Sequence, residues 1–144
     1  MRATLTQLIE RRAVTPCALA LMQQPAIEAM ALMRCGNVVG SITPDSFVID
    51  CETRTVEVVP IGTTPQESTV AADLAAYGSV LLLAIEANGA HLRRLERFAR
   101  RCCDGEFAHW EDARLTLERL ESSTIYWVLV ALILLLLLLL KVES

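Results

Sequence analysis

Apolar residues recur at helical spacing near the start of the chain. The stretch Leu5–Ile9 places its leucines and isoleucine on one face, which predicts a helix over residues 3–12. Thr4 and Thr6 are the two candidate caps for this helix, because a threonine hydroxyl can accept a hydrogen bond from a free backbone N–H of the first turn.

A second helix is expected over residues 16–35. Thr15 followed by Pro16 is typical of a helix start, with a capping hydroxyl and then a proline in the first turn. Gly36 is typical of a helix end. Pro25 lies within this range and predicts a kink or a split, because proline lacks the N–H that continues the helix.

The centre of the chain changes to short β-type patterns. Phe47–Ile49 and Val56–Val59 are rich in β-branched residues, and the polar stretch 51–54 separates them. This arrangement predicts a small hairpin, followed by a loop over residues 61–69.

The second half is helical by pattern. We expect helices over residues 70–87 and 90–103, with Asn88-Gly89 and Asp104-Gly105 as the breaks that end them. A last amphipathic helix begins near His109 and continues toward the C-terminal apolar run.

Residues 125–140 contain no charge, no glycine and no proline, and the last seven are all leucine. Sixteen helical residues span about 24 Å, and Ser122–Thr124 extend this toward the roughly 30 Å of a bilayer core. The alternative is a buried core helix, which is disfavoured because a small domain cannot cover a helix that is apolar on every face. The span includes Leu136 and ends in residues typical of bilayer interfaces: Tyr126, Trp127 and Lys141.

The chain is therefore divided into a domain at residues 1–121, a transmembrane helix at 122–141 and a short tail at 142–144. We expect a single-pass protein anchored at its C-terminal end, with the bulk facing the cytosol. The N-terminus is too polar for a secretory signal. An endomembrane is favoured. A mitochondrial membrane is the alternative, because the first nine residues carry no acid.

The residue composition argues against several classes of binding and catalytic site. Five cysteines without a CxxC pattern indicate reduced thiols. Adjacent Cys102 and Cys103 are expected at buried helix positions, with palmitoylation near the membrane as the alternative. A net charge of −4 without a basic stripe argues against nucleic acid as a partner. His91 and His109 lack companions at metal spacing and have no nucleophile motif nearby, so neither a metal site nor a Ser or Cys hydrolase is expected.

Residues 4 to about 120 resemble the C-lobe of the protein kinase fold. "TLTQLIERR" is similar to the helix that starts this lobe, and "AIEAMALMRCGNVV" to the helix that leads into the catalytic loop. "ADLAAYGSVLLLAIE" resembles the central buried helix, and "LRRLERFARRCCDGEFAHWEDARLTLERL" the closing helices. "PDS" before an apolar strand is most similar to the non-catalytic C-lobe module called KIND. The resemblance implies a mainly α fold with a small β-hairpin, followed here by one transmembrane helix.

The resemblance also implies that the catalytic groups are missing. Val39, Ser41 and Ser46 stand where a kinase has the histidine, aspartate and asparagine of its catalytic loop, and Pro60 replaces the D-F-G aspartate. Phosphoryl transfer needs an acceptor for the substrate proton and ligands for metal ions. We therefore expect no enzyme activity, no cofactor and no metal. Pro44 and Gly62 match residues that shape the loops, which implies a structural role.

We expect three aspartates to have structural rather than catalytic roles. Asp45 is expected to cap a turn after Pro44, and Asp50 to end a strand. Asp73 matches the kinase aspartate that accepts hydrogen bonds from the catalytic-loop backbone. The alternative for Asp73 is an ordinary helix N-cap.

The predicted function is a non-catalytic, membrane-anchored scaffold that holds a protein partner. By analogy with the surface that meets a kinase N-lobe, Val38, Val39 and Ile61 are the candidate contacts, although they are equally compatible with burial in the lobe. Four acids favour a basic peptide as partner: Glu57, Glu67, Asp73 and Glu86. The alternative function is an accessory structural subunit of a multi-protein membrane complex, in an organelle or a secretion system.

Overall fold

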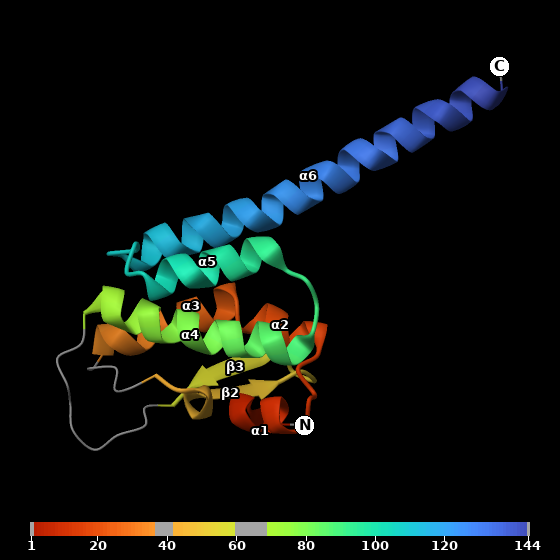
Figure 1. The fold of residues 1–144 in the computed structure, drawn as a ribbon. Helices are drawn as coiled ribbons and strands as arrows, with labels where there is room; N and C mark the ends of the chain where they lie inside the picture. The colour runs from red at the N-terminus through yellow and green to blue at the C-terminus, as the bar shows by residue number, and fades with distance from the viewer. Residues whose placement is uncertain (1, 37–41, 60–68, 144) are drawn as a thin grey trace.

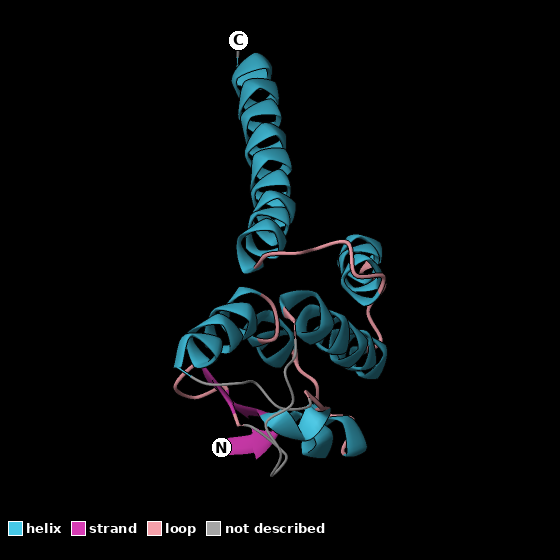
Figure 2. Ribbon diagram, turned by 90° about the vertical axis from the view of Figure 1, so that its left-hand side faces the viewer, coloured by secondary structure: helices cyan, strands magenta, loops and turns pink. Residues whose placement is uncertain are grey.

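The chain folds into a mainly helical domain from which one long helix projects (Figure 1). The computed structural model describes residues 2–36, 42–59 and 69–143. Figure 2 shows a small sheet with a short helix at one side of the domain, a layer of helices above it, and the long helix beyond them.

Three short strands form the sheet, in the order β1-β2-β3 with antiparallel pairing throughout. They are β1 (Arg2–Thr4), β2 (Phe47–Asp50) and β3 (Thr55–Val58). The predicted hairpin of β2 and β3 is confirmed, with Phe47 opposite Val58 and Asp50 opposite Thr55. Alternation places Phe47 and Ile49 of β2 in the core.

The first predicted helix is partly wrong, because residues 2–4 form β1 instead. Ala3 pairs with Ile49, 46 residues away, so a long-range contact overrides the local helical pattern. The helix α1 (Leu5–Glu10) follows, and Thr4 is its N-cap. The Thr4 hydroxyl accepts from the Gln7 N–H at 3.2 Å, while the Gln7 side chain accepts from the Thr4 N–H at 3.1 Å.

Pro25 splits the second predicted helix into α2 (Pro16–Leu21) and α3 (Gln24–Gly36). Thr15 caps α2 as expected, accepting a hydrogen bond from the Ala18 N–H at 3.2 Å. Pro25 stands in the first turn of α3, where its missing N–H costs nothing. The helix α3 contacts both β3 and the long C-terminal helix.

The helix α4 (Val70–Asn88) forms the centre of the core. Tyr77 is fully buried on it; its ring lies 6.4 Å from that of Phe47, and its hydroxyl donates to the Met22 carbonyl. Burial raises the pKa of Tyr77 well above its usual value, which keeps the hydroxyl a donor. Gly89 ends α4 in the left-handed conformation at φ 78°, as the sequence predicts.

The helix α5 (Arg93–Cys103) packs closely against α4 and begins three residues later than predicted. It buries Leu95, Phe98 and Cys102. Gly105, at φ 73°, follows its end and confirms the predicted break.

The helix α6 (Trp110–Glu143) is continuous over 34 residues, so it spans about 51 Å. The expected boundary between domain and membrane helix, at residues 121 and 122, therefore falls inside one element.

Candidate functional site

The predicted partner contacts lie outside the described residues. Val38, Val39 and the degenerate catalytic position Ser41 fall in residues 37–41, and Pro60, Ile61 and Gly62 fall in residues 60–68. Their described neighbours nevertheless show where these two segments attach to the fold.

A one-turn 3₁₀ helix over Pro44–Ser46 precedes β2. Ser46 is 1% exposed, and its hydroxyl accepts a hydrogen bond from the Thr43 N–H at 3.0 Å. The Ser46 carbonyl accepts from the Val59 N–H at 2.7 Å. The start of β2 and the end of β3 are thus tied together at one end of the hairpin, where Val59 directly precedes residue 60 and Ser46 follows residue 41 by five positions.

Asp45 and Asp50 occupy turns. Asp45 is the middle residue of the 3₁₀ turn and its side chain is exposed, while Thr43 takes the N-cap position, so the prediction that Asp45 caps this turn is wrong. Asp50 ends β2 as predicted. Although partial desolvation acts against its ionisation, backbone hydrogen bonds from Thr53 and Glu52 lower the pKa of the Asp50 carboxyl.

Asp73 is buried, with 3% of its surface exposed, in the first turn of α4. The N-cap is Thr69, whose hydroxyl accepts from the Ala72 N–H at 3.1 Å, so the N-cap interpretation of Asp73 is wrong. Asp73 precedes Tyr77 by four residues and shares its face of α4. Because Tyr77 faces Phe47, the Asp73 carboxyl lies on the side of α4 that faces the start of β2.

Three of the acidic residues predicted to attract a basic peptide are described by the structure, and they lie on β3 and α4. Asp73 and Glu86 stand 13 residues apart on α4, about 20 Å along its axis. Glu57 lies on β3 and pairs with Arg2. Glu67 lies outside the described residues.

The burial and polarity of the side chains on α6 change along its length. Ala113 and Leu117 are buried against the domain, and Leu120 is half-buried. On the solvent face, Arg114 pairs with Glu111 at 2.6 Å and with Glu118 at 3.8 Å. The hydrogen bond from Arg114 holds the pKa of the Glu111 carboxyl below its usual value.

From Ile125 onward the large apolar side chains of α6 are exposed, apart from half-buried Val130; Leu136, for example, is 60% exposed. The rings of Tyr126 and Trp127 meet edge to face, with centroids 5.9 Å apart. Lys141 lies in the last turn. Two described helices are long and apolar enough to cross a membrane: α4, of which much is buried, and α6, of which no part of the apolar window is buried. The helix α6 is therefore the candidate anchor.

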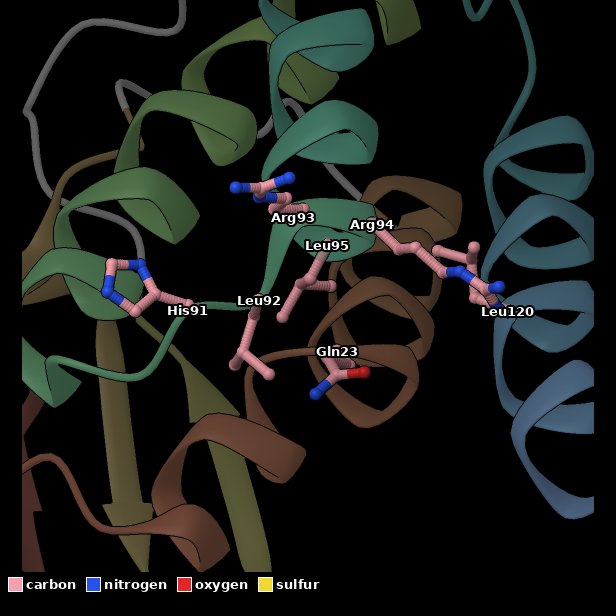
Figure 3. Close-up of a pocket in the computed structure, with 7 residues that line it drawn as sticks. All are labelled: Gln23, His91, Leu92, Arg93, Arg94, Leu95 and Leu120. Atoms are coloured by element: carbon pink, nitrogen blue, oxygen red, sulfur yellow. The ribbon is translucent and has the colours of Figure 1, made fainter. Parts of the chain in front are cut away.

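A cavity of about 430 Å³ opens where α6 leaves the domain (Figure 3). The start of α5 supplies most of its lining, together with one residue between α2 and α3 and one from α6. The lining residues are Gln23, His91, Leu92, Arg93, Arg94, Leu95 and Leu120. A second cavity of about 440 Å³ shares His91 with the first in its lining and includes Glu86, Glu96 and Arg100.

Sequence reasoning missed the first cavity. Its only signal in the sequence is the concentration of five arginines between residues 93 and 101 of an acidic chain, which the sequence does not connect to Gln23 or Leu120. Within the described parts of the chain, no three His, Cys, Asp or Glu residues stand close enough to hold a metal ion.

The cysteines that the structure describes are free thiols: Cys17, Cys51, Cys102 and Cys103. Cys102 is fully buried, and Cys103 is half-buried beside Ser79. Both thus lie on α5 as expected, but only Cys102 is fully buried.

Comparison with known protein families, with curated proteins and with solved structures gives no match to this chain. The class defined by the structure is a mainly helical domain with a small antiparallel sheet and a long apolar C-terminal helix.

Proposed function

We propose that this protein is a non-catalytic interaction module that a C-terminal helix anchors in a membrane. The main observation behind the proposal is that α6 changes from a helix packed on the domain to a helix with exposed apolar side chains. Up to Leu120 the helix packs on α3 and α5, and from Ile125 to Leu140 its exposed surface is apolar. An exposed apolar surface of this extent needs a bilayer or other apolar helices to cover it.

The proposal extends to a lobe of the kinase C-lobe type, with KIND as the most similar module. A central buried helix with a buried carboxylate, Asp73, on the side facing the Pro44–Ser46 turn supports this assignment. Ser46 is buried and its hydroxyl serves the turn itself, which supports a structural role for this position rather than metal binding.

The partner is a protein that docks beside Val38, Val39 and Ile61. The hydrogen bond between Ser46 and Val59 supports this site, because it brings the chain that follows residues 37–41 close to the chain that precedes residues 60–68. The spread of Asp73 and Glu86 along α4 favours apolar contact at this site over attraction of a basic peptide.

Deleting residues 125–144 tests the anchor. The full chain should stay in the membrane pellet at alkaline pH, and the shortened chain should be soluble with an unchanged α4–α5 core. A full chain that washes off membranes at alkaline pH would show that α6 covers a protein surface instead.

The substitution Ile61→Asp tests the docking site. It should abolish recovery of the partner from gently solubilised membranes while the helical circular dichroism signal stays unchanged. Thr64→Asp adds the same charge in the same segment and is the matched control. Loss of helical signal in Ile61→Asp would place Ile61 in the core and remove it from the docking site.

One observation favours the alternative function, an accessory structural subunit of a larger membrane complex. Leu32 on α3 is 76% exposed, an apolar side chain that a neighbouring subunit would cover. A protein that leaves membranes in mild detergent only with stoichiometric partners would support this alternative, and one that is stable alone would contradict it.

A further inference from the structure

Two half-buried thiols meet where α2 approaches the sheet. Cys17 lies in the first turn of α2, and Cys51 begins the turn that joins β2 to β3. The helix α2 contacts β2, and the sulfur of Cys51 lies 3.9 Å from the hydroxyl oxygen of Thr15, the N-cap of α2. The Cys51 sulfur therefore lies against the helical turn that carries Cys17.

The side chains of Cys17 and Cys51 interact directly. A hydrogen bond between the two thiols is the largest of the influences that raise the pKa of Cys17, and burial is the next. Residues 17 and 51 stand 34 positions apart in the chain, so the fold is what makes these two sulfurs neighbours.

The other two cysteines that the structure describes are less suited to pairing. Cys102 and Cys103 are consecutive residues of α5, so their side chains point about 100° apart around the helix. Cys102 is also fully buried, whereas Cys17 and Cys51 are both partly accessible to a small oxidant. Among the described thiols, Cys17 and Cys51 are the ones in position to form a disulfide.

We propose that Cys17 and Cys51 form a reversible disulfide that joins α2 to the β2–β3 turn under oxidising conditions. The oxidant is a small disulfide of the glutathione class. The thiolate of one cysteine attacks the sulfur–sulfur bond of the oxidant, which gives a mixed disulfide and releases one thiol. The second cysteine loses its proton and displaces the remaining thiol, so one oxidant molecule is reduced to two thiols as one protein disulfide forms.

The disulfide makes the stability of the domain depend on redox conditions. It closes the loop of residues 17–51, which includes α3 and β2, and a crosslink of this kind stabilises a fold mainly by reducing the entropy of the unfolded chain. Disulfides of cytosol-facing proteins are generally transient and respond to oxidation, which fits a reversible bond. The proposal depends on contacts within the domain and is independent of the membrane anchor.

Equilibration of the full chain, in mild detergent, with mixtures of reduced and oxidised glutathione tests the proposal. After the remaining thiols are blocked with iodoacetamide, peptide mass spectrometry without reduction identifies each linked pair. The Cys17–Cys51 peptide should predominate. Its equilibrium constant of formation should be at least about tenfold larger in the folded chain than in concentrated guanidinium chloride, because the fold holds the two thiols together.

Thermal unfolding followed by circular dichroism provides the second measurement. Oxidation should raise the melting temperature of the unaltered chain by at least about 5 °C, and dithiothreitol should reverse the rise. Cys17→Ser and Cys51→Ser should each abolish this shift. Cys103→Ser removes another half-buried thiol and is the matched control, so it should retain the shift.

Four outcomes would overturn the proposal. They are a predominant link from either residue to Cys35, Cys102 or Cys103, a link that forms only between two copies of the chain, equal equilibrium constants in the folded and denatured chain, and a Cys17–Cys51 link that leaves the melting temperature unchanged.

Discussion

Gly78 determines how closely α4 and α5 approach each other. A Cβ at this position would lie 2.5 Å from the carbonyl oxygen of Ala99 and 2.8 Å from the Cβ of Cys102. Both neighbours belong to α5, and the carbonyl is backbone, so relief requires one helix to move. The absence of a side chain at Gly78 therefore permits this close contact between α4 and α5.

Gly78→Ala should destabilise the domain by about 1–3 kcal/mol, because overpacking outweighs the better helix propensity of alanine. Thermal unfolding followed by circular dichroism measures the effect. The neighbouring exposed position supplies the control: Ser79→Ala should change the stability by less than about 0.5 kcal/mol. An unchanged melting temperature in Gly78→Ala would mean that α5 does not pack on α4 at this distance.

Cys102 illustrates how burial controls reactivity. Desolvation, with a smaller contribution from neighbouring Cys103, raises the pKa of the Cys102 thiol to about 12. Because folding raises this pKa, the reactive thiolate is scarce at every pH well below 12, and at pH 8 only about one thiol in ten thousand is ionised. Iodoacetamide at pH 8 should leave Cys102 unmodified in the folded protein and label it after denaturation.

Peptide mass spectrometry after timed labelling measures this difference, and half-buried Cys103 is the internal comparison. Labelling of Cys102 as fast as Cys103 in the folded protein would show that the α4–α5 contact opens readily.

At the scale of elements, α6 combines two kinds of helix. Its first part has a buried face and a charged face, on which Arg114 pairs with Glu111 and Glu118. Its second part has apolar residues on every face. A water-soluble domain covers the first kind, whereas the second is stable only in an apolar surrounding.

The free-energy cost of inserting a charged side chain into the membrane should depend on its position within the apolar segment of α6. Leu132→Arg places a guanidinium near the middle of Ile125–Leu140 and should cost about 2.5–3.5 kcal/mol of insertion free energy. Leu140→Arg, the matched control beside Lys141, should insert nearly as well as the unaltered chain, because its side chain reaches the interface. Insertion into microsomes, scored by resistance to alkaline extraction, compares the two. Equal insertion of both variants would contradict a spanning orientation.

At the scale of the whole molecule, the proposed non-catalytic function predicts that the protein does not respond to nucleotide. Two residues on which the proposed kinase-like assignment depends are buried: the Ser46 hydroxyl accepts from the Thr43 N–H within its turn, and Asp73 lies in the first turn of α4. Mg-ATP should therefore leave the melting temperature of the full chain unchanged. A ligand present at 100 times its dissociation constant would add about 2.7 kcal/mol, so a saturable upward shift would contradict the non-catalytic proposal.

The sequence predicted most element ends correctly because those ends depend on neighbouring residues. Thr15 caps α2, Pro25 separates α2 from α3, and Gly89 ends α4, and each acts through its own hydroxyl, ring or φ angle. The apolar segment of α6 is likewise determined locally, since sixteen uncharged residues are visible without any fold.

Tertiary structure decided the features that join distant parts of the chain. The strand β1 exists because Ala3 pairs with Ile49, and no local sequence pattern predicts that pairing. Asp73 is buried rather than a cap because α4 lies across the core, and the cavity beside α6 forms because this helix brings Leu120 near Arg94 and Gln23. The sequence alone determined local conformation and the need for an apolar surrounding, because both depend on neighbours along the chain. The cavity depends on residues almost 100 positions apart, so only the packing of the helices decided it.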